Sequence, residues 1–381
     1  MLTDQEVLRL TRLRHALHRE PELSGQERET AATIARHLEA IGGARVLTGL
    51  GGHGVAAIFD GRESGPSVLL RAELDGLPIQ ETGTMPYRST LPGKAHMCGH
   101  DGHMASLIGC ALALSRRGPA RGRVTLLFQP AEEDGSGAAA VIADPRFGEI
   151  RPDYAFSWHN MPWQPLGVAS MRDGPMFCAS VGLRVRMEGR TAHASQPEAG
   201  LSPAPALASL IQRVAALATG GEMDENFSLV TITHARLGEP TFGVAPGSAE
   251  LRATLRALDG ERMNRLRDDV GALARESAAR AGLAVAIDWH DDFASSVNDV
   301  EATAIVRRAL EARRIAHREL AAPFRASEDF GRFGTTARCA MFLLGAGEGV
   351  SMLHNPDYDF PDALIPIGAG VLVEAARELV G

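Results

Sequence analysis

The hexapeptide CGHDGH at residues 98–103 places a thiol and two imidazoles in a short stretch where an apolar helical pattern begins. Thiolate and imidazole together suit borderline-soft divalent metals such as Zn²⁺. A helix that begins at Asp101 would lower the pKa of the Cys98 thiol and favour the thiolate that a metal requires. Loop residues that cap a helix give the same pattern, so a metal site and a structural cap are both open. His103, one turn after His100, is more typical of a packed or supporting histidine than of a ligand.

Further candidate ligands follow in other parts of the chain. Glu132 and Glu133 come shortly after an apolar run, and adjacent carboxylates can divide two tasks, one binding a metal and the other accepting a proton from water. His159 and His354 each follow an apolar stretch. A solvated acidic loop and two structural or exposed histidines would explain the same residues without a metal.

Two more residues have both a functional and an ordinary interpretation. Asp75 ends an apolar run, where it could orient a ligand imidazole or simply cap the following turn. His193 lies far along the chain from the other candidates, and its neighbours do not distinguish it from an ordinary loop histidine. Whether these groups form one site therefore depends on the elements that position them.

Those elements alternate between strand and helix patterns. Short apolar runs typical of strands occur at 54–60, 67–75, 123–129 and 153–158. Helical stretches such as 101–117 separate them, which predicts an α/β domain with a largely parallel sheet. His159 and the two carboxylates come just after strands, at the edge where open α/β sheets bind ligands. The Ser24-x-x-Glu27 pattern predicts a capping box ahead of a further helix that Gly42 ends.

The middle of the chain follows a different order. From 177 to 289 the runs read β-α-β-β-α-β, which is typical of a ferredoxin-like α+β unit. We expect this unit to be inserted into a discontinuous catalytic domain made of residues 1–176 and 290–381. The length of 381 residues also favours two domains.

Composition excludes several classes of partner. A net charge of −8, with acidic and basic residues interspersed, argues against nucleic acid and anionic membranes. No run approaches the roughly 20 apolar residues of a membrane span, and the start of the sequence lacks the pattern of a secretory signal. Four scattered cysteines do not make a disulfide framework. We therefore expect a cytoplasmic protein with reduced thiols.

In combination and in order, the motifs resemble the M20 family of metallopeptidases and amidohydrolases. The similarity is to the branch of bacterial amidohydrolases, hippurate hydrolases and plant indole-acetyl amino-acid hydrolases, and it runs almost end to end. The motifs are RHALHREPELS at 14–24, LRAELDGLPIQE at 70–81, HMCGHDGH at 96–103, FQPAEE at 128–133, GRTAHA at 189–194, SEDF at 327–330, and HNP at 354–356 before DF at 359–360. The resemblance implies a phosphorylase/hydrolase-like catalytic domain with an inserted lid and dimerisation domain.

The resemblance also implies a binuclear metal centre. It would hold two divalent ions, Mn²⁺ or Zn²⁺, with Ni²⁺ and Co²⁺ as further candidates. The implied ligands are Cys98, His100, Glu133, His159 and His354, with Cys98 as the bridging ligand.

Roles for the remaining candidates follow from the same resemblance. Glu132 would be the general base and acid that acts on a metal-activated water, and Asp75 would support it near the ligands. In similar enzymes the lid domain dimerises and brings a histidine, here His193, to the scissile carbonyl in the partner subunit's site. Arg256 matches an arginine that grips a substrate carboxylate. These roles predict hydrolysis of N-acyl amino acids, hippurate-like or N-acetyl, by a homodimer, with larger assemblies left open.

Two departures from the family pattern affect these expectations. An Asn-x-Ile-Pro turn of the family is replaced by Gly243 and the three residues after it, so a side-chain amide that would contact substrate is lost. Glu73 stands where the family tends to have Asp, a difference that we expect to be tolerated. A dipeptidase or aminoacylase of the wider family therefore stays open as an alternative function, as does a catalytically silent homologue that only binds ligand.

Overall fold

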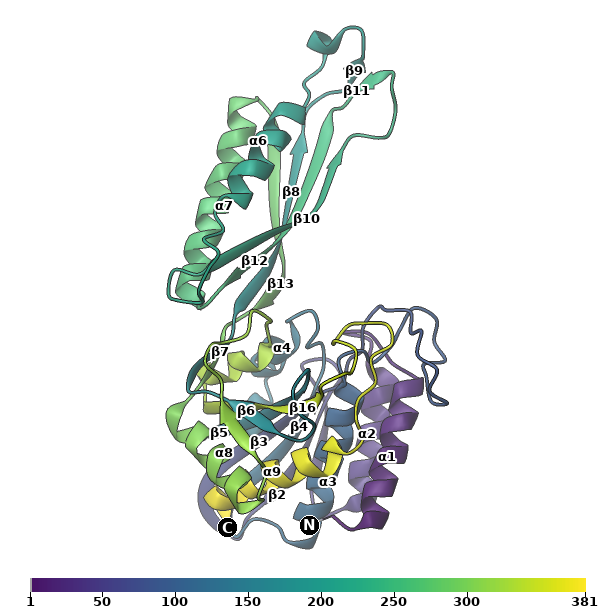
Figure 1. Cartoon of the computed structure of the whole chain (residues 1–381), viewed down its shortest axis with the longest axis vertical. Coiled ribbons are helices and arrows are strands. Elements are labelled where there is room, and N and C mark those ends of the chain that lie inside the picture. Colours follow the sequence, from purple (N-terminus) through teal and green to yellow (C-terminus); the bar gives the residue numbers. More distant parts are fainter. Residues whose placement is uncertain (1) are drawn as a thin grey trace. The chain divides into compact units, whose positions relative to one another are not determined.

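The computed structural model describes residues 2–381, which divide into two compact units (Figure 1). The first unit comprises the residues up to Met176 together with Ser296–Ala321 and Asp329–Gly381. The second unit comprises Phe177–Ser295 and Ala322–Glu328. No helix among residues 2–381 is both long enough and apolar enough to cross a membrane.

The return from the second unit to the first differs from the predicted boundary at residue 290. Strand β13 (Ala284–Phe293) stays in the sheet of the second unit to its end, so the chain returns only at Ser296. The segment Ala322–Glu328 also belongs to the second unit. This segment contains no helix or strand, so no periodic sequence pattern predicts where it belongs.

An eight-stranded sheet forms the centre of the first unit, in the order β1-β2-β4-β3-β5-β16-β6-β15. The strands are β1 (Arg45–Leu50), β2 (Gly54–Asp60), β3 (Glu63–Glu73), β4 (Arg121–Gln129), β5 (Tyr154–Pro162), β6 (Ala169–Met171), β15 (His317–Glu319) and β16 (Arg338–Gly347). The central strands β4, β3, β5 and β16 pair in parallel, whereas β1, β2 and β4 pair antiparallel. The parallel part of the sheet is the part that carries the candidate ligands.

Helices cover this sheet. The main ones are α1 (Asp4–Arg19), α2 (Arg28–Ile41), α3 (His100–Arg116), α8 (Val300–Ala312) and α9 (Leu364–Val380), with short helices α4 (Gly137–Ala143) and α5 (Phe147–Ile150) and the 3₁₀ helix η2 (Asp329–Thr335). Helix α3 contacts β3 as well as α1, α2 and α9, so it is buried on nearly every side. This explains why its sequence is apolar all round rather than amphipathic.

The start of α2 contradicts the predicted capping box. Ser24 does not cap the helix, because its hydroxyl donates to the buried carboxylate of Asp75 at 2.7 Å. Glu22 instead accepts hydrogen bonds from the main-chain N–H and the hydroxyl of Thr30 in the first turn. The side chain of Glu27 accepts from the N–H groups of Gly25 and of a residue beyond β4. The hydroxyl of Ser24 therefore bonds to Asp75, a buried acceptor from another part of the chain, instead of capping the helix that follows it.

The second unit has the ferredoxin-like order predicted from the sequence. Its antiparallel sheet has the order β10-β12-β8-β13, with β8 (Ala179–Glu188), β10 (Ser228–Leu237) and β12 (Ser248–Ala257), and Figure 1 shows helices α6 (Ala204–Ala215) and α7 (Gly260–Arg280) on one face. One apolar core joins the helices to the sheet. Two further pairs are the ribbon of β9 (Ala192–His193) with β11 (Val244–Ala245) and the pair of β7 (Gly174–Phe177) with β14 (Ser296–Asn298).

Candidate metal centre

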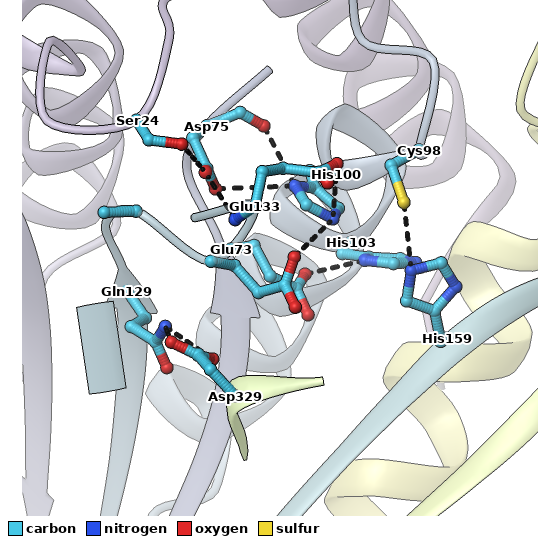
Figure 2. A network of polar contacts seen from close by, with 12 residues as sticks. Ser24, Glu73, Asp75, Cys98, His100, His103, Gln129, Glu133, His159 and Asp329 are labelled. Carbon is cyan, nitrogen blue, oxygen red and sulfur yellow. Dashed lines mark hydrogen bonds and ion pairs between the residues drawn. The ribbon is translucent and has the colours of Figure 1, made fainter. Parts of the chain in front are cut away.

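The candidate ligands of the first unit converge at one edge of its sheet. Strands β3 and β4 run parallel, and Asp75 and the Glu132–Glu133 pair follow their C-terminal ends. His159 lies inside β5, which continues to Pro162, and not after the strand as the sequence predicted; His100 is the first residue of α3 (Figure 2). Parallel strands end at the same edge of a sheet, which is why groups far apart in sequence meet here.

Gly99 sets the geometry between the first two candidate ligands. It occupies the N-cap of α3 in the left-handed region, with φ of 91°. A Cβ at this position would lie 2.6 Å from the side-chain oxygen of Asn160. Glycine is therefore required both by the backbone conformation and by the close approach of Asn160. The resulting turn brings Sγ of Cys98 to 3.4 Å from Nε2 of His159.

His100 is held in the orientation of a metal ligand. Its Nδ1 donates to the main-chain oxygen of Asp75 at 2.9 Å. Its Nε2 is buried with no hydrogen-bond partner in residues 2–381, and it lies 3.9 Å from carboxylate oxygens of both Glu132 and Glu133. A histidine ligand commonly donates one ring N–H to a carbonyl so that the other nitrogen can bind the metal. The residues present therefore fit a metal at this position.

The charge around His100 also favours a cation. Burial by itself would lower the pKa of His100, but the hydrogen bond with Asp75 and the nearby charges of Glu73 and Glu133 raise it to about 10. The imidazole therefore lies in a strongly negative local field. A divalent cation at Nε2 would be stabilised by the same carboxylates.

Two sets of candidate donor atoms share Cys98. The donor atoms of Cys98, His100 and His159 lie within 4.8 Å of one another, and so do those of Cys98, Glu133 and His354. A further set within the same limit joins Glu132 to His100 and Glu133. The first two sets have only the thiol of Cys98 in common.

His354 approaches from a loop rather than from the sheet. Its Nε2 lies 3.6 Å from Oε2 of Glu133, and about half of its side chain is exposed. Its backbone is left-handed, with φ of 65°, and its main-chain N–H donates to the oxygen of Met97 at 2.8 Å. This bond fixes the His354 loop beside the segment that carries Cys98.

The predicted low pKa of the Cys98 thiol is wrong. Burial, together with the charges of Glu133, Glu132 and Glu73, raises the pKa of this thiol well above its ordinary value. The start of α3 is close by, but its dipole is a smaller effect than complete burial beside three carboxylates. The thiolate at this position therefore needs the charge of a bound cation to be stable.

Asp75 connects two of the candidate ligands. Its Oδ2 accepts from the hydroxyl of Ser24 at 2.7 Å and from the main-chain N–H of Glu133 at 2.9 Å. Burial would raise the pKa of Asp75, but these bonds and the contact with His100 lower it below its ordinary value. Asp75 is thus a charged, buried support for His100 and Glu133.

His103 was expected to be a packed or supporting histidine, but its partners and the wider network around the candidate ligands were not predicted from the sequence. Nδ1 of His103 lies 2.7 Å from Oε2 of Glu73, and Nε2 lies 2.6 Å from Oδ1 of Asn160. Both ring nitrogens of His103 are therefore engaged, which agrees with the expected supporting role. Arg71 donates to Glu73 and, at 2.6 Å, to Asp329 from η2. The signal in the sequence was the pair of motifs at 70–81 and 327–330, in which only Asp75 had an assigned role.

Two predicted substrate contacts, His193 and Arg256, belong to the second unit. His193 ends β9 with its side chain exposed, and Nδ1 lies 2.7 Å from Oγ of Ser195. Arg256 on β12 is half-buried, and one Nη donates to the main-chain oxygen of Arg325 at 2.9 Å and to Oγ of Ser327 at 2.8 Å. No carboxylate of residues 2–381 forms an ion pair with Arg256, and burial lowers its pKa.

This fold and this site define a class of protein. The first unit gathers a thiol, imidazoles and paired carboxylates at the ends of its parallel strands, and a ferredoxin-like unit is inserted into its sequence. This combination is typical of a two-domain metal-dependent hydrolase. The sequence profile described as peptidase family M20/M25/M40 matches residues 69–378. The chain belongs to this family, so the predicted resemblance is confirmed.

Individual relatives agree with the family assignment. The chain is 31% identical over 369 residues to an N-acetyl-L-cysteine deacetylase of Bacillus subtilis (strain 168), with coverage of 97% of this chain and 87% of the relative. It is 31% identical over 371 residues to a hippurate hydrolase of Campylobacter jejuni, with coverage of 96% and 95%. Among solved structures, the Bacillus subtilis YXEP protein, a dinuclear metal binding peptidase from the M20 family, superposes with a TM-score of 0.82 at 27% identity over 99% of both chains.

Proposed function

We propose that this protein is a metal-dependent amidohydrolase that cleaves the amide bond of N-acyl amino acids. The observation that carries the proposal is the pair of donor sets that share Cys98, with Glu132 beside them at 3.9 Å from Nε2 of His100. The names of two relatives, N-acetyl-L-cysteine deacetylase and hippurate hydrolase, support an N-acylated amino acid as substrate.

The cofactor in this proposal is a pair of divalent ions. The five ligands would be Cys98, His100, Glu133, His159 and His354, with Cys98 between the ions. A mixture of thiolate, imidazole and carboxylate suits Zn²⁺ well, and Mn²⁺, Ni²⁺ and Co²⁺ are compatible with the nitrogen and oxygen donors. Such ions, when bound, polarise a carbonyl group and make water a stronger acid.

The side chains of the chain itself supply proton transfer and substrate binding. Glu132 accepts the proton of the attacking water and returns it to the departing amine. Asp75 holds His100 and Glu133 in place during this transfer. His193 donates a hydrogen bond to the substrate carbonyl oxygen as it becomes negative. Arg256, whose described partners are neutral oxygens, binds the carboxylate of the amino acid.

A homodimer through the second unit completes the proposal, with His193 of one protomer serving the site of the other. Strand β10 supports this arrangement because it lies at one edge of the four-stranded sheet and is largely exposed over its second half. An exposed sheet edge is a ready site for pairing with another strand. Sedimentation analysis would test it, because a strictly monomeric but active protein would contradict the assigned role of His193.

The decisive experiment separates metal binding from proton transfer. Glu132→Gln should keep both ions, measured as metal per protein, and lose turnover by roughly 100-fold or more, because general acid–base catalysis contributes about that much. Glu133→Gln is the matched control and should lose metal as well as activity. Near-native turnover of Glu132→Gln would contradict the proposed mechanism.

A substrate panel tests the specificity. It would contain N-acetyl amino acids, hippurate and dipeptides, each with Mn²⁺, Zn²⁺, Ni²⁺ or Co²⁺ added. Hydrolysis of dipeptides alone would indicate the dipeptidase alternative. That alternative agrees with Gly243, which replaces the family asparagine and so lacks its side-chain amide. Tight binding of N-acyl amino acids without turnover under any of these conditions would indicate a silent binding protein.

A further inference from the structure

The main chain around His193 is fixed on both sides. His193 pairs with Val244 across the β9–β11 ribbon, and the N–H of Ala194 donates to the oxygen of Gly243 at 3.0 Å. The main-chain oxygen of His193 accepts from the N–H of Gln196 at 2.8 Å. The exposed imidazole is therefore attached to a defined backbone, and the remaining freedom is its rotation and its tautomer.

Two polar groups of Ser195 contact the same ring nitrogen of His193. Its main-chain N–H donates to Nδ1 of His193 at 3.1 Å, and its Oγ lies 2.7 Å from the same nitrogen. A nitrogen that accepts from an N–H presents its lone pair, and a neutral imidazole carries only one hydrogen. That hydrogen must be on Nε2, and the hydroxyl of Ser195 also acts as a donor toward Nδ1. No residue of the described chain, 2–381, has a polar contact with Nε2 of His193.

We propose that Ser195 is a positioning residue that holds His193 as the Nε2–H tautomer, so that Nε2 presents a donor to the carbonyl oxygen of the substrate. The inference rests on the proposed function, in which His193 contacts that oxygen. The opposite tautomer would present a lone pair to an atom that becomes negative during the reaction. A donor that is set before substrate binds needs no reorganisation as the charge develops.

The kinetic test uses Ser195→Ala and Ser195→Thr. Ser195→Ala removes one of the two bonds to Nδ1, so kcat should fall roughly three- to tenfold, the worth of a neutral hydrogen bond, while KM and the unfolding midpoint stay unchanged. Ser195→Thr keeps the hydroxyl and should restore kcat. Ser202→Ala is a matched control in the same unit, because it removes a hydroxyl that accepts from the N–H of Ala204 without touching His193. A raised KM or a lowered unfolding midpoint in Ser195→Ala would assign it a merely structural role and overturn the inference.

The spectroscopic test does not depend on turnover. ¹⁵N NMR of protein labelled at its 13 histidines, with His193 assigned by its disappearance in His193→Ala, should show Nδ1 without and Nε2 with a hydrogen. A wild-type spectrum with hydrogen on Nδ1 overturns the inference.

Failure of the proposed function gives a different pattern. If His193→Ala turns over substrate normally, His193 is outside the site, and the catalytic role assigned to it falls together with the inference. If His193→Ala is impaired while Ser195→Ala keeps native kcat, only the inference falls.

Discussion

The main-chain oxygen of Asp75 lies 2.9 Å from Nδ1 of His100 and accepts its hydrogen. The carboxylate of the same residue accepts the main-chain N–H of Glu133. One buried residue after β3 therefore orients a candidate ligand at the start of α3 and another after β4. The orientation of these two candidate ligands thus depends on a residue that is not itself a candidate ligand.

Replacement of Asp75 by Asn tests this dependence. The amide has one acceptor where the carboxylate has two, and it removes a negative charge beside His100. We expect metal affinity to fall roughly 10- to 100-fold, as is usual when a group that orients a ligand is changed. Competition with a metallochromic chelator measures it. Ser24→Ala, which removes only one hydrogen bond to Asp75, should cause a smaller loss, and equal losses would contradict this account.

Metal stoichiometry tests the shared position of Cys98. Because Cys98 belongs to both donor sets, Cys98→Ala should lose both ions after dialysis against metal-free buffer. His354→Ala disrupts one set and should lose one ion. Cys110→Ala, which changes a buried thiol further along α3, should lose neither. Cys98→Ala that retains one tightly bound ion per chain would show that its thiol does not bridge.

The candidate ligands could be predicted because each has a local signal. Glu133 and His159 follow apolar runs that end at one sheet edge, and Cys98 and His100 precede a strong helical pattern. The order of the motifs then supplied their roles by resemblance. The alternation of strands and helices likewise fixed the α/β class without knowledge of any contact.

The partners of the supporting residues could not be predicted in the same way. Glu73 and His103 are 30 positions apart in sequence, and Asn160 is 57 positions from His103. Each of these residues contacts a partner on another element, and no local sequence pattern specifies such a contact. Ser24 is the clearest example, because its spacing to Glu27 suggested a helix cap whereas its hydroxyl binds Asp75. The raised pKa of the Cys98 thiol has the same origin, since burial and distant carboxylates outweigh the local helix.

Gly99→Ala tests the turn between Cys98 and His100. With φ of 91° and Asn160 at 2.6 Å from the added carbon, alanine should destabilise the fold by about 1–3 kcal/mol through backbone strain and displace a ligand. Urea unfolding and metal content measure the two effects. Gly148→Ala is the control, because nothing lies within 4 Å of the added carbon and its place in α5 makes alanine acceptable. If Gly99→Ala were as stable as Gly148→Ala, the turn at Gly99 would not require glycine.

The pH dependence of stability should report on His18, which lies in a buried polar cluster of α1 outside the proposed ligand set. Its Nδ1 lies 2.9 Å from the carboxylate of Asp101, and its Nε2 lies 3.3 Å from Glu81. Burial opposes protonation, but these two carboxylates outweigh it, and Arg14 acts in the opposite direction. The net result is that the pKa of His18 rises from 6.5 to about 9.

A group whose pKa is higher in the folded state than in the unfolded state stabilises the fold. This contribution is fully present when the pH is below the unfolded-state pKa, and it is lost as the pH rises through the folded-state pKa. The contribution of His18 should therefore be complete at pH 6 and largely gone by pH 10, a change on the order of 3 kcal/mol. We expect the free energy of unfolding in urea to fall more steeply over this range for the wild type than for His18→Gln. His234→Gln changes an exposed histidine on β10 and should follow the wild type. Parallel curves for the wild type and His18→Gln would show that the carboxylates do not hold the charged form of His18, because every other titrating group is common to the two proteins.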